Sequence, residues 1–195
     1  LRTPLTRMRL QLALMKDNED TKAISSDISE MEEMIDGYLA FAAGEGDEPP
    51  QELAIDDVLS RLVTQAHKSH KFDITLSPVK DDIPAFPMRR NAIQRAFSNI
   101  ISNAIRYSTK TIVAIRMRND EVIITFDDNG AGIPQERRAD AIRPFIRLEE
   151  SRNRRTGGAG LGLSITSDVI LSHGGELTLG DSPLGGLRVA IKLPV

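Results

Sequence analysis

The chain has 195 residues, a formal net charge of −3, 40% hydrophobic residues and no cysteine. These values indicate a globular chain with one full domain and a smaller accessory unit, and they exclude a disulfide framework. The weak negative charge gives no general basic field, so we expect no nucleic-acid partner. No apolar run approaches the roughly 20 residues that span a bilayer, so we expect contact with a membrane only through parts absent from this sequence.

Residues 1–45 predict a helical hairpin. Apolar residues recur in alternating steps of four and three from Leu1 to Met15, and again from Ile24 to Ala42 after a short polar break. This spacing is typical of helices that pack against other helices. Two such narrow apolar seams bury little surface alone, so we expect a second copy to complete a four-helix bundle, making the protein a homodimer.

Residues 46–53 are rich in Gly, Pro and acidic residues and predict a linker. Residues 54–195 then predict a second domain. Helical spacing marks 55–66, 91–107 and 161–174, and strand patterns mark 72–76, 111–117, 121–128, 176–180 and 185–195. This order favours helices on one side of a largely antiparallel sheet, a two-layer α/β sandwich, and an α+β fold class for the whole chain.

A polar stripe interrupts the otherwise apolar helix at 91–107. Asn99, Asn103 and Arg106 stand at steps of four and three, on one face. Asparagine is a poor helix former, which favours a compensating functional role, although a solvated helix face that happens to carry asparagine is an equal alternative.

Two runs are rich in glycine, of which the first follows a predicted strand and the second leads into a predicted helix. In DDNGAGIP, Gly130 and Gly132 allow close approach of a ligand to the backbone, and the Asp128 carboxylate can accept from an exocyclic amine; an ordinary turn is the alternative. In GGAGLGLSI, the glycines leave backbone N–H groups free at a helix N-terminus, where an anion is favoured. The second run matches neither a Walker loop nor a Rossmann fingerprint, and a plain linker or helix start is its alternative.

Four short motifs follow one another in an order that resembles the N, G1, F and G2 boxes of sensor histidine kinases. They are the asparagine stripe, DNGAG, RPFIR (Arg143 to Arg147) and GAGLGL. The opening LRTPL is similar to the later part of the H box of the same family. The resemblance covers the whole chain, and RRNAIQRAFSNIISNAIRYS is most similar to the EnvZ-like branch. It implies a dimerisation and histidine-phosphotransfer hairpin followed by a Bergerat-type ATP-binding domain.

The resemblance also implies roles for individual residues. Asn103 would be the Mg²⁺ ligand and Asn99 would support the ATP–metal complex, while Arg106 would face the phosphates, Tyr107 the nucleoside and Asp128 the adenine amine. Further ATP contacts would come from the glycine-rich loops and the lid: Gly130, Gly132, Arg147, Gly158, Gly160, Leu161 and Gly162. For Arg147 and the basic run at 152–155, a solvated loop is the alternative.

Some positions depart from the family pattern. Ile142 stands where the F box usually has phenylalanine, and Ala159 stands where the G2 box commonly has threonine, but neither change argues against a working site. The phosphoacceptor histidine would fall two positions before Leu1, outside this sequence. Surface or capping roles are expected for the three histidines of the chain. Thr3 matches the residue that orients water during dephosphorylation, with a helix-surface threonine as the alternative.

The implied function is that of the cytoplasmic catalytic core of a sensor histidine kinase, anchored in the bacterial inner membrane by other parts of the protein. It would use Mg²⁺-ATP to phosphorylate a histidine, relay the phosphoryl group to an aspartate of a response regulator receiver domain, and act as a phosphatase. A non-phosphorylating, ATP-gated partner of a response regulator is one alternative. A serine-phosphorylating anti-sigma kinase or a chaperone-type ATPase is another, which the N-terminal hairpin argues against.

Overall fold

The computed structural model describes residues 2–15, 18, 21, 24, 25, 28, 31, 48–70, 72–146 and 160–195. Helix α1 spans Arg2–Ala13. Residues 21, 24, 25, 28 and 31 are also helical, but most of the second expected helix lies outside the described residues. The hairpin and the four-helix bundle therefore stay predictions. Within the described part of the chain, no helix is both long and apolar enough to cross a membrane.

The remaining elements form one α+β domain. In chain order they are β1 (Gln51–Leu53), α3 (Ile55–His70), β2 (Asp73–Leu76), β3 (Phe86–Met88), α4 (Arg90–Tyr107), β4 (Lys110–Arg118), β5 (Glu121–Asp128), the short 3-10 helix η2 (Gln135–Arg137), α5 (Arg138–Ala141), α6 (Gly162–Ser172), β6 (Glu176–Asp181) and β7 (Leu187–Pro194). The longer helices and strands match the segments that the sequence periodicity predicts.

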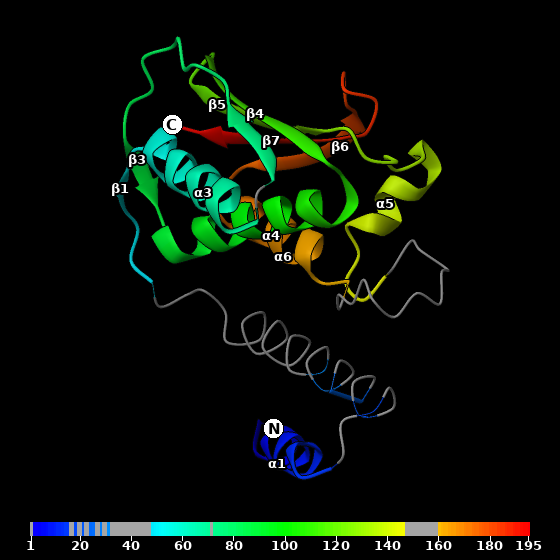
Figure 1. Ribbon diagram of the computed structural model, residues 1–195. Coiled ribbons are helices and arrows are strands. Elements are labelled where there is room, and N and C mark those ends of the chain that lie inside the picture. Colours follow the sequence, from blue (N-terminus) through cyan, green and yellow to red (C-terminus); the bar gives the residue numbers. More distant parts are fainter. Residues whose placement is uncertain are drawn as a thin grey trace.

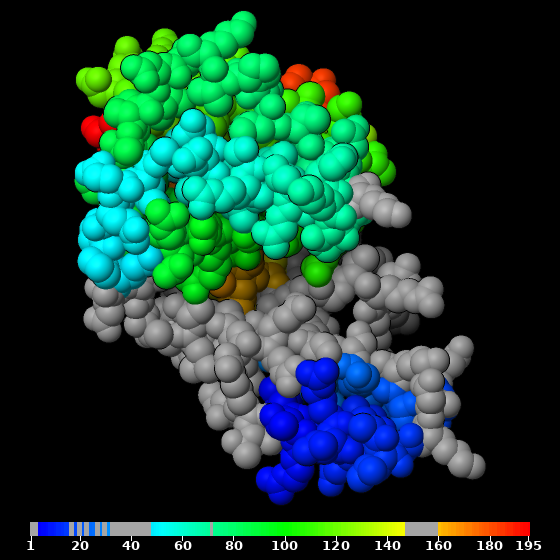
Figure 2. All heavy atoms as spheres, turned by 60° about the vertical axis from the view of Figure 1, so that its left-hand side comes forward, coloured from blue at the N-terminus to red at the C-terminus, as the bar shows by residue number. Residues whose placement is uncertain are grey.

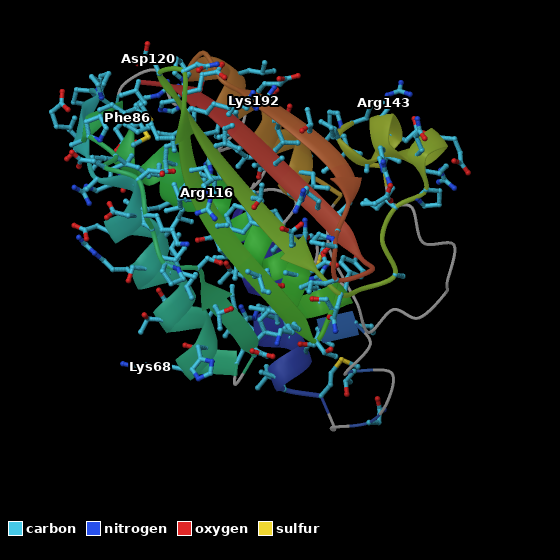
Figure 3. All side chains as sticks on the ribbon, turned by 90° about the horizontal axis from the view of Figure 1, so that it is seen from above. Lys68, Phe86, Arg116, Asp120, Arg143 and Lys192 are labelled. Carbon is cyan, nitrogen blue, oxygen red and sulfur yellow. The ribbon has the colours of Figure 1, made fainter. Side chains whose placement is uncertain are left out.

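Five strands form the main sheet in the order β2-β4-β5-β7-β6. The pairing of β2 with β4 is parallel and the other pairings are antiparallel. Helices α3, α4 and α6 lie together on one face of this sheet (Figure 1). The opposite face carries side chains such as Arg116 of β4 and Lys192 of β7, with no helix over them among the described residues (Figure 3). The two-layer arrangement with a largely antiparallel sheet is the one expected.

The core lies between the sheet and the three helices. Alternate residues of the central strands are buried, as in Val113 and Ile115 of β4, because successive side chains of a strand point to opposite faces. Helix α4 supplies the facing layer, and the ring of its Phe97 lies 5.9 Å from that of Phe126 in β5, between centroids. Helix α3, in cyan to blue-green, forms part of the outer surface over this layer (Figure 2).

Part of the expected linker is folded. Residues 51–53 form β1, which pairs with β3 in an antiparallel two-stranded sheet. Leu53 and Met88 on these strands are buried, with exposed fractions of 2% and 0%. Strands of three residues with glutamate and proline show no readable alternation, so the sequence predicts a linker at 51–53 and no strand at 86–88.

Two histidines make hydrogen bonds near the C-terminal ends of helices α6 and α3. His173 follows α6, and its Nδ1 lies 2.7 Å from the carbonyl oxygen of Val169. Its Nε2 accepts the backbone N–H of Arg89 at 3.0 Å, so the ring proton belongs on Nδ1. His67 reaches the carbonyl oxygen of Phe72 at 3.0 Å, and the third histidine is exposed. The expected capping and surface roles therefore hold.

The first turn of α4 is capped by a residue that is distant in sequence. Arg89 occupies the N-cap position and its side chain makes no capping hydrogen bond. Instead, Glu48 accepts the backbone N–H of Asn91 at 2.9 Å and that of Ala92 at 3.3 Å. A carboxylate at this place satisfies two of the helix's free N–H groups and complements the helix dipole. The segment before β1 is thus tied to the first turn of α4.

We predict that Glu48→Ala lowers the free energy of unfolding by about 0.5–2 kcal/mol, the usual cost of removing a helix cap. Urea unfolding followed by circular dichroism measures this change. Glu52→Ala is the matched control, because Glu52 is an exposed residue of β1 with no capping contact among the described residues. Equal stability of the two variants would contradict the capping role.

Candidate functional site

The polar stripe of α4 faces the start of α6. Asn99 donates from Nδ2 to the carbonyl oxygen of Gly162 at 3.3 Å. A Cβ on Gly162 would lie 3.7 Å from the Cβ of Asn99 and 3.8 Å from Nδ2 of Asn103, so both asparagines lie against this glycine. The hydroxyl of Thr166 joins the same two helices, donating toward the carbonyl oxygens of Gly162 at 2.8 Å and Ala96 at 3.2 Å. Figure 1 shows α4 and α6 side by side.

The N-terminus of α6 has the properties of an anion site. Leu161 occupies the N-cap position and makes no side-chain capping hydrogen bond with the described residues. The free N–H groups of a first turn carry partial positive charge. The preceding Gly160 has φ +67°, and a Cβ there would lie 2.9 Å from the carbonyl oxygen of Ile146, so the approach to the helix requires glycine. The Phe145 N–H donates to the carbonyl oxygen of Gly160 at 3.1 Å and holds this approach in place.

Asp128 ends strand β5 and is fixed through one oxygen. Its Oδ1 accepts the backbone N–H of Gly130 at 2.8 Å and that of Leu187 at 3.0 Å. Its Oδ2 accepts no hydrogen bond from the described residues. The carboxylate is therefore held rigidly while one oxygen stays available to a donor.

The turn after Asp128 packs against the end of α4. A Cβ on Gly130 would lie 2.4 Å from the carbonyl oxygen of Tyr107, so a side chain there would push the turn away from the helix. This close approach brings Asp128 to the end of α4 that carries Arg106 and Tyr107, both exposed. Gly132, at φ +69°, continues the same turn.

The neighbouring Asp127 serves a different purpose. Its side chain points to the other face of the sheet, is 7% exposed, and binds Arg188 through two hydrogen bonds of 2.6 and 2.8 Å. Hydrogen bonding to Asp127 raises the pKa of Arg188. The charge of Asp127 is thus neutralised locally, and only the second aspartate of the DD pair faces the helices.

Sequence reasoning missed Gly186, which lies in the turn before β7. A Cβ there would lie 2.2 Å from Oδ1 of Asp128 and 2.4 Å from the backbone nitrogen of Gly130. Its own N–H donates to the carbonyl oxygen of Asp128 at 3.2 Å. The available signal is the GG pair at 185–186, which by itself indicates only the start of a strand.

The structure does not test every expected site residue. Arg147, Gly158 and the basic run at 152–155 lie outside the described residues. Thr3 lies in α1, but its side chain is not described. The structure therefore brings together the asparagine stripe, the turn after Asp128 and the start of α6, and leaves the expected lid and the hairpin threonine as predictions.

Comparison with known proteins identifies the family of the chain. Residues 88–195, more than half of the chain, match the family described as histidine kinase-, DNA gyrase B-, and HSP90-like ATPase. The chain belongs to this family. It is 34% identical to the sensor histidine kinase CpxA of Escherichia coli K12, over all of this chain and 45% of that protein. It is 32% identical to the sensor protein RstB of the same organism, over all of this chain and 46% of that protein.

Solved structures share the fold. The ATP-binding domain of PrrB from Mycobacterium tuberculosis is 27% identical and matches with a TM-score of 0.60, over 76% of this chain and 98% of that one. Full-length ShkA, crystallised with AMPPNP, is 20% identical and matches with a TM-score of 0.72, over 99% of this chain and 43% of that one. The chain spans less than half the length of the curated relatives named above. The resemblance to sensor histidine kinases and the ATP-binding fold that it implied are confirmed.

We predict that Gly186→Ala distorts the turn after Asp128, because the added methyl group would overlap the Asp128 carboxylate. Nucleotide affinity should fall at least about tenfold, since the sequence predicts Asp128 as the acceptor for the adenine amine and the variant would displace it. Calorimetric titration with ATP measures the loss. Gly180→Ala is the control, because a Cβ there would meet only Cβ of Arg188, at 4.0 Å. Similar affinities of the two variants would show that the turn does not need glycine.

Proposed function

We propose that this chain is the catalytic core of a cytoplasmic sensor histidine kinase, which binds Mg²⁺-ATP, phosphorylates a histidine and relays the phosphoryl group to a response regulator. The observation that carries the proposal is the Asp128 carboxylate at the end of β5, which is anchored through Oδ1 and accepts no hydrogen bond from the described residues at Oδ2. An anchored acceptor of this kind suits the exocyclic amine of adenine. The proposal extends the family membership to a specific activity.

The nucleoside would lie against the end of α4. Asp128 would accept from the adenine amine, and the glycines Gly130 and Gly132 would let the base approach the backbone closely. Tyr107, which is 46% exposed, would cover the nucleoside with its ring. Aromatic side chains of this kind contribute large contact areas to binding.

The phosphates would lie between the polar stripe of α4 and the start of α6. Asn103 makes no hydrogen bond with the described residues, so its amide oxygen is free to bind Mg²⁺, which prefers hard oxygen ligands. Asn99 would support the ATP–metal complex, and Arg106 would face the phosphates. When bound, Mg²⁺ supplies charge neutralisation on the phosphate oxygens.

The loop before α6 and the expected lid would close around the triphosphate. This part of the proposal rests on free backbone N–H groups at the start of α6 and on the following residues: Arg147, Gly158, Gly160, Leu161 and Gly162. Positioning and charge neutralisation carry most of the catalysis in phosphoryl transfer, which fits a site without an acid or base placed for proton transfer among the described residues.

The hairpin would supply the rest of the reaction. The accepting histidine would belong to the H-box motif that LRTPL resembles, on a hairpin that dimerises with a second copy. Thr3, in α1, would orient the water that removes the phosphoryl group from the regulator. That phosphoryl group would have reached an aspartate of the receiver domain by transfer from the phosphorylated histidine.

Asp128→Asn should weaken ATP binding about ten- to a hundredfold, because a hydrogen bond to a charged acceptor contributes about 1.5–3 kcal/mol. Isothermal titration calorimetry measures the change. Asp120→Asn is the matched control, since Asp120 lies in the tight turn between β4 and β5 at φ 59°, which asparagine tolerates. Unchanged affinity of the Asp128→Asn variant would remove this residue from the nucleobase site.

Asn103→Ala should abolish the part of ATP affinity that depends on Mg²⁺, because alanine offers no oxygen ligand. The measurement is ATP binding with Mg²⁺ and with EDTA. Ser102→Ala, at the exposed neighbouring position of α4, is the control and should keep the full dependence. A full Mg²⁺ dependence in Asn103→Ala would exclude this residue as a metal ligand.

The proposed activity is tested on a protein that contains this chain together with the preceding hairpin residues. Incubation with γ-labelled ATP should produce a label that is stable to alkali and labile to acid, as expected for phosphohistidine. The label should pass to a receiver domain, and Asn103→Ala should prevent both steps. Binding of ATP without any label would instead support the non-phosphorylating, ATP-gated partner.

A further inference from the structure

The side chain of Asn129 ties two segments of the candidate site together. Its Oδ1 accepts the backbone N–H of Thr109 at 3.0 Å and that of Lys110 at 2.9 Å. Its Nδ2 donates to the hydroxyl oxygen of Thr109 at 3.0 Å, and its own backbone N–H donates to the carbonyl oxygen of Lys110 at 3.2 Å. This set of hydrogen bonds, the Asn129 clamp, joins the turn after β5 to the segment that leads from α4 into β4.

The clamp lies beside a close contact between the same two segments. A Cβ on Gly130 would lie 2.4 Å from the carbonyl oxygen of Tyr107 and 3.2 Å from Oδ1 of Asp128. The backbone of Gly130 therefore lies between the end of α4 and the carboxylate. Asn129 directly precedes Gly130, so the clamp holds Gly130 in this place.

The position of Gly130 determines how the Asp128 carboxylate is held. The N–H of Gly130 donates to Oδ1 at 2.8 Å, and the other donor to this oxygen is the N–H of Leu187, at 3.0 Å. One anchor thus comes from the turn that Asn129 clamps and the other from β7. Hydrogen bonds weaken steeply when their geometry is lost. A displaced Gly130 would release one anchor of Oδ1, and Oδ2 would lose its fixed direction.

We infer that Asn129 is a positioning residue for nucleobase recognition, which acts through Asp128 and not by contact with the nucleotide. The inference rests on the proposed function, in which Asp128 accepts from the adenine amine. An acceptor that is already held in place loses little freedom when it binds its donor. Loss of the clamp therefore weakens the contact with the amine, and it leaves the contacts with the phosphates as they are.

Titration calorimetry of the 195-residue chain with ATP and with purine riboside triphosphate, which lacks the amine, tests this inference. The wild type should prefer ATP. In Asn129→Ala, ATP affinity should fall about three- to tenfold and the affinity for purine riboside triphosphate should stay the same. Asn129→Asp should retain most of the preference, because its oxygen still accepts both N–H groups. Asn91→Ala, at the exposed opposite end of α4, is the matched control and should bind like the wild type.

A double-mutant cycle shows whether the effect passes through Asp128. In the Asp128→Asn background, Asn129→Ala should cause no further loss of ATP affinity, because the carboxylate that the clamp positions is already gone. Losses that simply add in the double variant would overturn the inference.

A purely structural clamp gives a different result. It would lower the melting temperature of Asn129→Ala and weaken both nucleotides equally, and an unchanged preference for ATP would overturn the inference while the proposed function stands. No preference of the wild type for ATP would overturn the inference together with the contact of Asp128 with the amine. Failure of the wild type to bind either nucleotide would overturn the proposed function as well. If Asn129→Ala does not fold, Asn129→Ser, whose side chain is too short to hold both segments, provides the same comparison.

Discussion

The site depends on one hydrogen-bonded carboxylate oxygen. Oδ1 of Asp128 accepts N–H groups from Gly130, two residues ahead, and from Leu187, 59 residues further along the chain. This oxygen joins the turn after β5 to the start of β7, so the two segments that enclose the carboxylate are fixed by the carboxylate itself. Oδ2 is left as a positioned acceptor. Gly186 makes this arrangement possible, because any side chain there would occupy the place of Oδ1.

Helix α4 connects the site to the rest of the domain. Its first turn is capped by Glu48 from the segment before β1, and the N–H of Arg89 just before it donates to His173 at the end of α6. Its second half presents Asn99 and Asn103 to the start of α6. With 18 residues, the helix is about 27 Å long and links the entry of the domain to the site. A helix held at both ends keeps the side chains of its polar stripe in fixed positions.

The alternation of side chains along β5 places its two C-terminal aspartates on opposite faces of the sheet. Asp127 and Asp128 are adjacent in sequence and face opposite sides of β5. Arg188 neutralises Asp127 on the face away from the helices. Asp128 stays on the helix side, beside Thr111. Two identical residues in the DD pair thus have separate tasks, one in the stability of the sheet and one in the site.

The sequence by itself determined the long elements and the local motifs. Periodicity over many residues revealed α3, α4, α6 and the strands β4, β5 and β7, because burial of one face repeats along each element. The stripe of Asn99 and Asn103 and the Asp128 turn were readable, since each motif lies within one continuous segment. Only the tertiary structure decided the strands β1 and β3, the cap by Glu48, and the contacts of Gly186 with Asp128. Those features join segments distant in sequence, and their geometry exists only after the sheet and helices have packed.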